Sequence, residues 1–132
     1  MEPRHIIDEL ELQPHPEGGW FRETWRESSG GGTRPTGSAI YFMLTKGNDS
    51  RLHRIDATEI WHYYTGAAVE LAVADRDGVE TVHLLGPDMR GNQRPQFIVS
   101  PGAWQRARTV GEYSLVGCTV SPAFEWSHFE LG

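Results

Sequence analysis

The chain has 132 residues, enough for one domain whose core needs neither a disulfide nor a structural metal. Its 18 acidic and 12 basic residues give a formal net charge of −6 at pH 7, and the basic residues do not cluster, so we expect no nucleic-acid partner. Cys118 is the only cysteine, which excludes an intrachain disulfide, and its apolar neighbours predict a buried thiol. No signal peptide opens the sequence, and no apolar run approaches the ~20 residues of a membrane span, so we expect a cytoplasmic protein with no membrane contact.

The first predicted element is a short helix at His5–Leu12. Its apolar residues recur at helical spacing with acidic residues between them, and Pro14 and Pro16 prevent the helix from continuing. The glycine pair Gly18–Gly19 then predicts a turn into the first strand.

The rest of the chain predicts short strands separated by turn residues. A loop at Ser28–Gly32 follows the first strand, and the almost wholly apolar Ser38–Thr45 predicts a strand covered on both faces. The predicted strands are Phe21–Trp25, Ser38–Thr45, Arg51–Ile55, Glu59–Tyr64, Val69–Ala74, Val79–Leu85, Gln96–Val99, Trp104–Arg108 and Tyr113–Thr119. About nine short strands, with no alternation of strand and helix, predict an all-β antiparallel sandwich or barrel.

Side chains that can bind a metal or transfer a proton gather in the stretch Ser50–Gly66. His53 and Glu59 fall on two successive predicted strands, and Gly66 can turn the chain into the strand that follows. Successive side chains of a strand point to opposite faces, so an inward His53 predicts that Arg51 and Ile55 also face inward.

This stretch resembles the first motif of the cupin superfamily, in which a His, a second His two positions later, a Glu and a closing Gly recur with nearly this spacing. Ile55 stands where the second His occurs. The segments HPEGGWFRETW (15–25), GSAIYFMLT (37–45) and YSLVGCTVSPAF (113–124) resemble the small single-domain Cupin-5 branch. The resemblance runs from about Ile7 to Leu131. It implies one cupin domain over residues 1–132, a double-stranded β-helix or jelly-roll barrel with one short N-terminal helix.

The metal ligands of the superfamily are only partly present. The segment VSPGAWQ (99–105) resembles the second cupin motif, and Gln105 stands where that motif carries a third His. One imidazole, one carboxylate and one amide form a weak set for iron or zinc. We therefore expect no tightly bound metal cofactor. The alternative is a divalent metal held by His53, Glu59 and Gln105, with His62 as a further ligand if its strand is bulged.

The cupin resemblance implies that Glu59 faces the barrel cavity. His53, Trp61 and Tyr63 then face the cavity with it, and His62 lies on the outer side of the strand. We predict that His53, Glu59 and Tyr63 are catalytic. Residues predicted to contact the ligand are Glu23, Tyr41, Trp61 and Gln105.

Weaker patterns occur elsewhere. Either Arg22 or Glu23 must face the cavity if the first strand crosses the barrel, although both fit a solvated edge strand equally well. His15 belongs to the HPEGG segment and is predicted to form a turn, with ligand gating as the alternative. The remaining histidines, His5, His83 and His128, are expected near the surface.

Three functions fit these residues. The first is a metal-independent epimerase or isomerase acting on a sugar-like or hydroxy-acid ligand, with His53 as the base, held by a carboxylate, facing a tyrosine acid. The second is a metal-dependent dioxygenase or isomerase. The third is a non-catalytic module that binds a small molecule in an aromatic cavity.

The outer side of the barrel predicts a homodimer. If Glu59 faces inward, Ile60 and Tyr64 face outward and need cover, and a helix of about eight residues is too short to supply all of it. We expect a second copy to cover the outer face of one sheet, with His62 near the contact.

Overall fold

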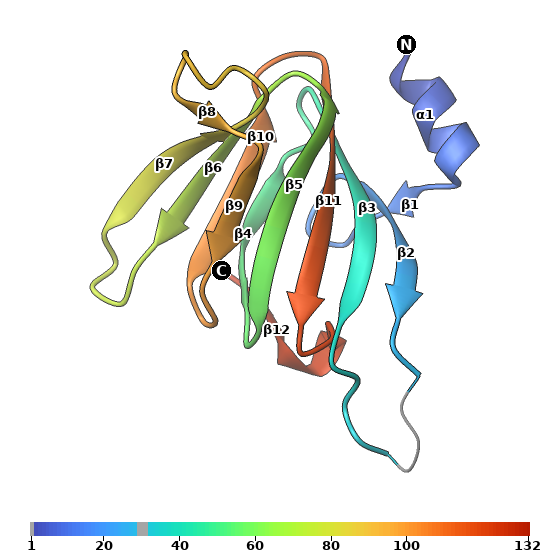
Figure 1. Cartoon of the computed structure of the whole chain (residues 1–132), viewed down its shortest axis with the longest axis vertical. Helices are drawn as coiled ribbons and strands as arrows, with labels where there is room; N and C mark the ends of the chain where they lie inside the picture. The colour runs from blue at the N-terminus through green and yellow to red at the C-terminus, as the bar shows by residue number, and fades with distance from the viewer. Residues whose placement is uncertain (1, 29–31) are drawn as a thin grey trace.

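The computed structural model describes residues 2–28 and 32–132. These residues form two six-stranded sheets that face each other (Figure 1). The first sheet has the order β1-β2-β3-β11-β5-β9, and the second has the order β12-β4-β10-β6-β7-β8. Among the described strands, neighbours pair antiparallel except β7 and β8, which pair parallel. The fold is a jelly roll, as predicted.

The elements have the following bounds. The α-helix is α1 (Pro3–Leu10), and a 3-10 turn, η1 (Trp126–His128), lies near the C-terminus. The strands are β1 (Gln13–Pro14), β2 (Trp20–Arg26), β3 (Ser38–Thr45), β4 (Ser50–Ile55), β5 (Thr58–Gly66), β6 (Val69–Ala74), β7 (Glu80–Leu85), β8 (Gln93–Arg94), β9 (Gln96–Val99), β10 (Trp104–Thr109), β11 (Tyr113–Ser121) and β12 (Phe129–Leu131).

Every strand predicted from the sequence is present, and no end differs from the prediction by more than two residues. The helix ends before the predicted Leu12 because Glu11 adopts the left-handed conformation, with φ of 57°, and its N–H caps the last turn. The unpredicted strands β1, β8 and β12 are two or three residues long, too short to show a period. The predicted Ser28–Gly32 loop lies mostly outside the described residues.

The core fills the space between the sheets, and a smaller cluster lies outside it. Phe42 faces the core, whereas its neighbour Met43 faces outward, where Ile6 and Ile7 of α1 pack on it. Both faces of β3 are therefore covered, which explains its continuous apolar sequence. Helix α1 covers only one end of the outer face of the first sheet (Figure 1).

A tight turn between β1 and β2 presses against the loop before β4. Gly18 has φ of 107°, and a Cβ atom there would lie 1.9 Å from the carbonyl oxygen of Asp49. Only glycine allows the backbone of the turn to come this close to the Asp49 carbonyl oxygen. The Arg51 N–H also donates to the Glu17 carbonyl oxygen at 2.7 Å, which ties the turn to the start of β4. The turn carries His15 and Glu17 to the end of the barrel.

Strand β4 contains an irregularity that changes the predicted facing of its residues. Its register against β10 shifts between the pairs Gln105–His53 and Ala107–Ser50. Ser50, His53 and Ile55 are therefore buried, whereas Arg51 is exposed. The prediction that Arg51 faces inward is wrong, because a bulge breaks strict alternation.

No helix within residues 2–28 or 32–132 has both the length and the apolar character needed to cross a membrane.

Candidate functional site

A cavity of about 60 Å³ lies between the sheets at the end of the barrel that the C-terminal segment closes. The turn before β2, strands β2, β3, β4, β5 and β11, and the C-terminal segment all contribute to its wall. Its lining residues are His15, Glu17, Phe21, Glu23, Ser38, Ile40, His53, Ile55, Glu59, Cys118, Val120, Phe124, Trp126 and Phe129.

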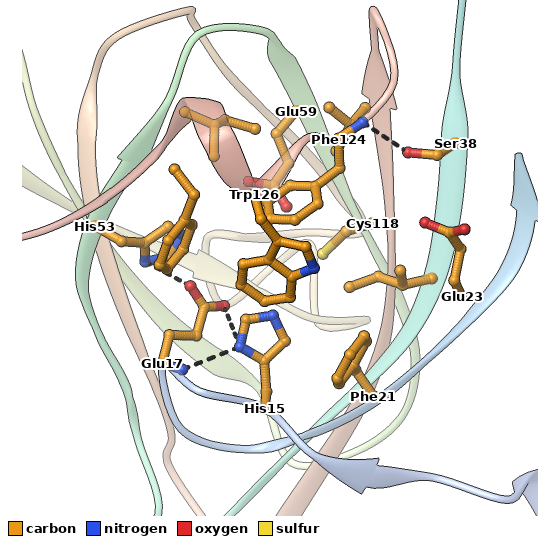
Figure 2. A pocket seen from close by; sticks show the side chains of 14 residues that line it. His15, Glu17, Phe21, Glu23, Ser38, His53, Glu59, Cys118, Phe124 and Trp126 are labelled. Carbon is orange, nitrogen blue, oxygen red and sulfur yellow. Dashed lines mark hydrogen bonds and ion pairs between the residues drawn. The ribbon is translucent and has the colours of Figure 1, made fainter. Parts of the chain in front are cut away.

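Two histidines of this cavity contact one carboxyl group. Glu17 lies between the rings of His15 and His53 (Figure 2). Its Oε2 atom is 3.0 Å from Nδ1 of His53, and its Oε1 atom is 3.8 Å from Nδ1 of His15. The side chains of all three residues are at most 8% exposed. Residues far apart in the sequence thus form one buried polar cluster.

The hydrogen bonds of the two rings fix opposite tautomers. Nδ1 of His53 is 2.8 Å from the Arg51 carbonyl oxygen, which only accepts, so this nitrogen carries the proton. Nδ1 of His15 accepts from the Glu17 backbone N–H at 3.1 Å, so this nitrogen is unprotonated. A neutral His53 therefore presents an Nε2 lone pair, and a neutral His15 presents an Nε2–H group.

Burial favours the uncharged form of each titratable group in the cluster. Burial lowers the pKa of His53 from 6.5 to about 4, although the hydrogen bond to the Arg51 carbonyl opposes the shift. The pKa of His15 is also lowered to about 4, by burial first and by nearby His53 second. Burial raises the pKa of the Glu17 carboxyl well above its ordinary value, and nearby Glu59 adds to the rise. Both imidazoles are therefore neutral at pH 7.

Buried side chains on the core side fix the second carboxyl group of the cavity, that of Glu59. Gln105 donates from Nε2 to Glu59 Oε1 at 2.7 Å and accepts at Oε1 from the Trp61 indole N–H at 2.9 Å. Burial raises the pKa of Glu59, and the hydrogen bond from Gln105 opposes that rise. Glu59 is therefore fixed in position by a chain of buried side chains.

Aromatic side chains of the C-terminal segment close the cavity. Trp126 lies over His15 (Figure 2), with ring centroids 5.4 Å apart. Phe129 stacks on His53 at 5.5 Å. Arg26 donates to the carbonyl oxygen of Phe124 at 2.6 Å, and β12 pairs with β4 beyond the turn. The segment is thus attached to both sheets.

The structure brings three of the residues predicted for the site to this cavity. His53, Glu59 and Glu23 line it, and Glu23 also forms a two-pronged ion pair with Arg26 at 3.1 and 2.9 Å. Trp61 and Gln105 lie behind Glu59 in the core and do not line the cavity. They hold the Glu59 carboxyl group in place from the core side.

The two predicted tyrosines lie elsewhere. Tyr63 faces inward but four residues along β5 from Glu59, where its hydroxyl donates to the Gly66 carbonyl oxygen at 2.7 Å. Tyr41 faces outward beside Tyr64 and the guanidinium of Arg22. The expected placement of a tyrosine acid opposite His53 is therefore wrong, because alternation gives the face of a residue but not its depth in the barrel.

Sequence reasoning missed Glu17 and treated His15 mainly as part of a turn. The signal that could have found them was the glycine pair after them, since two glycines with positive φ allow a turn to approach the barrel mouth closely. The aromatic cover at Phe124, Trp126 and Phe129 follows the last long strand and has no period, so no sequence pattern indicates it.

The residues named as metal ligands in the alternative prediction, His53, Glu59 and Gln105, do not fit a metal ion. Both polar atoms of the Gln105 amide are used in hydrogen bonds, and Ile55 offers no donor. Among residues 2–28 and 32–132, no group of three or more His, Cys, Asp or Glu side chains has an arrangement that could hold a metal ion. His62 lies on the outer face, bonded to Thr119 and Gln96.

The family model described as Cupin superfamily (DUF985) matches residues 4–132 of the chain. The chain belongs to this family, Cupin_5. Protein SO0799 from Shewanella oneidensis is 36% identical to this cupin, with a TM-score of 0.95, over 100% of this chain and 85% of the other. A hypothetical protein from Leishmania major is 30% identical, with a TM-score of 0.91, over 100% of this chain and 88% of the other.

More distant structures share the fold. Oxalate decarboxylase from Bacillus subtilis is 11% identical to this cupin, with a TM-score of 0.69, over 92% of this chain and 30% of the other. At that identity the similarity shows the cupin fold alone. No protein with a curated description matches the chain.

Proposed function

We propose that this cupin is an isomerase or epimerase that moves a proton on a small molecule in the barrel cavity without a metal. The observation that supports this proposal is the pair of neutral histidines, His15 and His53, with opposite tautomers on one carboxyl group. Such a pair offers a base and a hydrogen-bond donor to the same bound molecule.

His53 has the role of the base. Its Nδ1–H donates to the Arg51 carbonyl, which leaves the Nε2 lone pair for a proton of the ligand. Glu17, 3.0 Å from Nδ1, holds the ring and stabilises the positive charge that arrives with that proton. Since the pKa of His53 is about 4, the base is unprotonated throughout the neutral range.

His15 takes the place that the sequence assigned to a tyrosine. Its Nε2–H can donate to the carbonyl oxygen of the ligand while the neighbouring carbon loses its proton. Removal of the proton at one face and its return at another face or carbon gives epimerisation or isomerisation. The buried Glu59 completes the polar part of the wall.

Exchange of carbon-bound hydrogen with solvent tests the proposal directly. The wild-type protein is incubated in D₂O with dihydroxyacetone, L-lactate and D-glycerate, and loss of the signal from hydrogen next to the carbonyl group is followed by NMR. We expect exchange above the buffer rate for at least one compound. His53→Gln should lower the rate at least about 100-fold, as loss of a general base does.

His62→Gln is the matched control, because His62 lies on the outer face of the first sheet. It should exchange at the wild-type rate. Absence of exchange in the wild-type protein with all three compounds would contradict the proposal. Binding of one of them without exchange would identify a binding module instead.

A further inference from the structure

The described lining of the cavity contains acidic groups and two neutral histidines, but no arginine or lysine that could pair with an anion. Among the described residues that line it, two carboxyl groups, Glu17 and Glu59, are at most 8% exposed, and none is an arginine or lysine. The guanidinium groups of Arg26 and Arg51 already have partners. Arg26 binds Glu23 and the Phe124 carbonyl, and Arg51 binds the Pro16 carbonyl. A carboxylate or phosphate in the cavity would lose its hydration and gain no opposite charge.

The cavity also limits the size of the ligand. Its volume is about 60 Å³, whereas one water needs about 10–15 Å³ of such space, so it holds a molecule of about four to six non-hydrogen atoms. Typical pockets for larger ligands have volumes of about 300–1,000 Å³. The C-terminal segment that closes the cavity is not free to move outward and enlarge it, because Arg26 and Arg34 donate to the carbonyl oxygens of Phe124 and Ala123.

The aromatic cover does not form a cage for a cation. The rings of Phe124 and Trp126 pack edge to face with centroids 4.7 Å apart, and Phe129 packs on Trp126 at 5.3 Å. Rings in mutual contact leave no gap between them for an ammonium group. The carboxyl oxygens also have partners already, since Glu59 accepts from Gln105 and Glu17 contacts His53.

We infer that the ligand of this cavity is a small uncharged hydroxycarbonyl compound, and that the cavity rejects carboxylates and phosphate esters. The inference rests on the proposed function and chooses the sugar-like class over the hydroxy acids. The carbon-bound proton next to the carbonyl passes to Nε2 of His53, and its electron pair moves into the enediolate. The oxygen of that enediolate accepts the His15 Nε2–H hydrogen bond. The hydroxyl proton of the enediolate passes from one oxygen to the other, and return of the proton from His53 to the adjacent carbon completes the isomerisation, so no oxidant or reductant is needed.

A matched set of three compounds tests the ligand class by binding alone. Dihydroxyacetone is uncharged, D-glycerate is an anion, and serinol carries an ammonium group in place of the carbonyl group of dihydroxyacetone. Each is titrated into the wild-type protein at pH 7, and the ring-proton NMR signals of His15 and His53 report occupancy. We expect dihydroxyacetone to bind at least about tenfold more tightly than either charged compound. Tighter binding of glycerate or serinol, or no binding of any compound, would overturn the inference.

A neutralising variant tests whether the acidic wall causes the rejection of anions. Glu59→Gln should reduce the preference for dihydroxyacetone over glycerate at least about threefold. Glu70→Gln, on the outer face of the second sheet where Glu70 pairs with Arg108, should leave it unchanged. An unchanged preference in Glu59→Gln would contradict the charge argument.

The exchange assay separates failure of the inference from failure of the proposed function. Exchange on glycerate but not on dihydroxyacetone would overturn the ligand class and keep the proton-transfer function. Preferential binding of dihydroxyacetone without exchange would keep the ligand class and overturn the function.

Discussion

At the scale of single residues, the cavity places two buried histidines beside two buried carboxyl groups. Burial lowers the pKa of His15 and His53 to about 4 and raises the pKa of Glu17 and Glu59. Proton transfer from a glutamic acid to a histidine would create two buried charges, which a site with few other polar groups disfavours. Burial therefore keeps the two imidazoles uncharged at neutral pH and shifts the two carboxyl groups towards their protonated form.

These shifts affect stability with opposite signs. A histidine with a lowered folded-state pKa binds fewer protons than in the unfolded chain between about pH 4 and 6.5, so it costs stability as the pH falls through that window. A carboxyl group with a raised folded-state pKa, such as Glu17, costs stability as the pH rises through that pKa. The dependence of wild-type stability on pH is the sum of both effects.

Replacement of one histidine isolates its contribution to the pH dependence of the unfolding free energy. We predict that His53→Gln lowers the slope of unfolding free energy against pH, between pH 4 and 6.5, by up to about 1.4 kcal/mol per pH unit. The variant no longer has an imidazole that the unfolded chain protonates more readily. Urea denaturation at several pH values measures the slope, and His62→Gln controls for the substitution. Equal slopes in His53→Gln and the wild type would refute the prediction.

At the scale of elements, the turn before β2 determines where half of the polar cluster lies. Gly18 and Gly47 both have positive φ, 107° and 82°, but only Gly18 is crowded, because the Asp49 carbonyl oxygen lies 1.9 Å from the position that a Cβ atom would take. An alanine at Gly47 meets no atom within 4 Å. Comparison of alanine substitutions at the two glycines therefore separates the cost of backbone strain from the cost of a steric clash.

We predict that Gly18→Ala costs at least about 3 kcal/mol of unfolding free energy, because the turn must move away from the loop before β4. Gly47→Ala should cost only about 1–2 kcal/mol, the strain of a left-handed alanine. Chemical denaturation measures both values. The displaced turn should also weaken proton exchange in Gly18→Ala but not in Gly47→Ala. Similar costs for the two variants would show that the turn adapts without moving.

The elements also show what the sequence could predict. The apolar period and turn residues indicated each longer strand, and the cupin resemblance placed His53 and Glu59 at one cavity, which both of them line. The bulge in β4 depends on the pairing of β4 with β10, which no local pattern records. The contact of Glu17 with His53 joins a turn to a strand 36 positions later and likewise depends on tertiary packing.

At the scale of the whole molecule, the two outer faces differ in character. Ion pairs cross the outer face of the second sheet, where Arg106 binds Glu80 and Arg108 binds Glu70. The outer face of the first sheet instead carries large apolar side chains beyond the reach of α1. Those that are about half exposed or more include Trp25 at 53%, Tyr64 at 50% and Ile98 at 61%. A face of this kind is typical of a protein contact, whereas a face crossed by ion pairs is typical of solvent.

We therefore predict a two-fold homodimer through the outer face of the first sheet, with His62 near the contact. Ile98 pairs with Ile60 in the register of β9 and β5, so a charge at Ile98 would fall in the middle of the apolar surface. Ile98→Lys should shift the protein from dimer towards monomer in light scattering. Val82→Lys places the same charge on the second sheet, where Val82 is 57% exposed, and should leave the dimer intact. A wild-type mass near the 14.9 kDa of one chain at micromolar concentration would refute the prediction. The apolar face of the first sheet would then need a different partner.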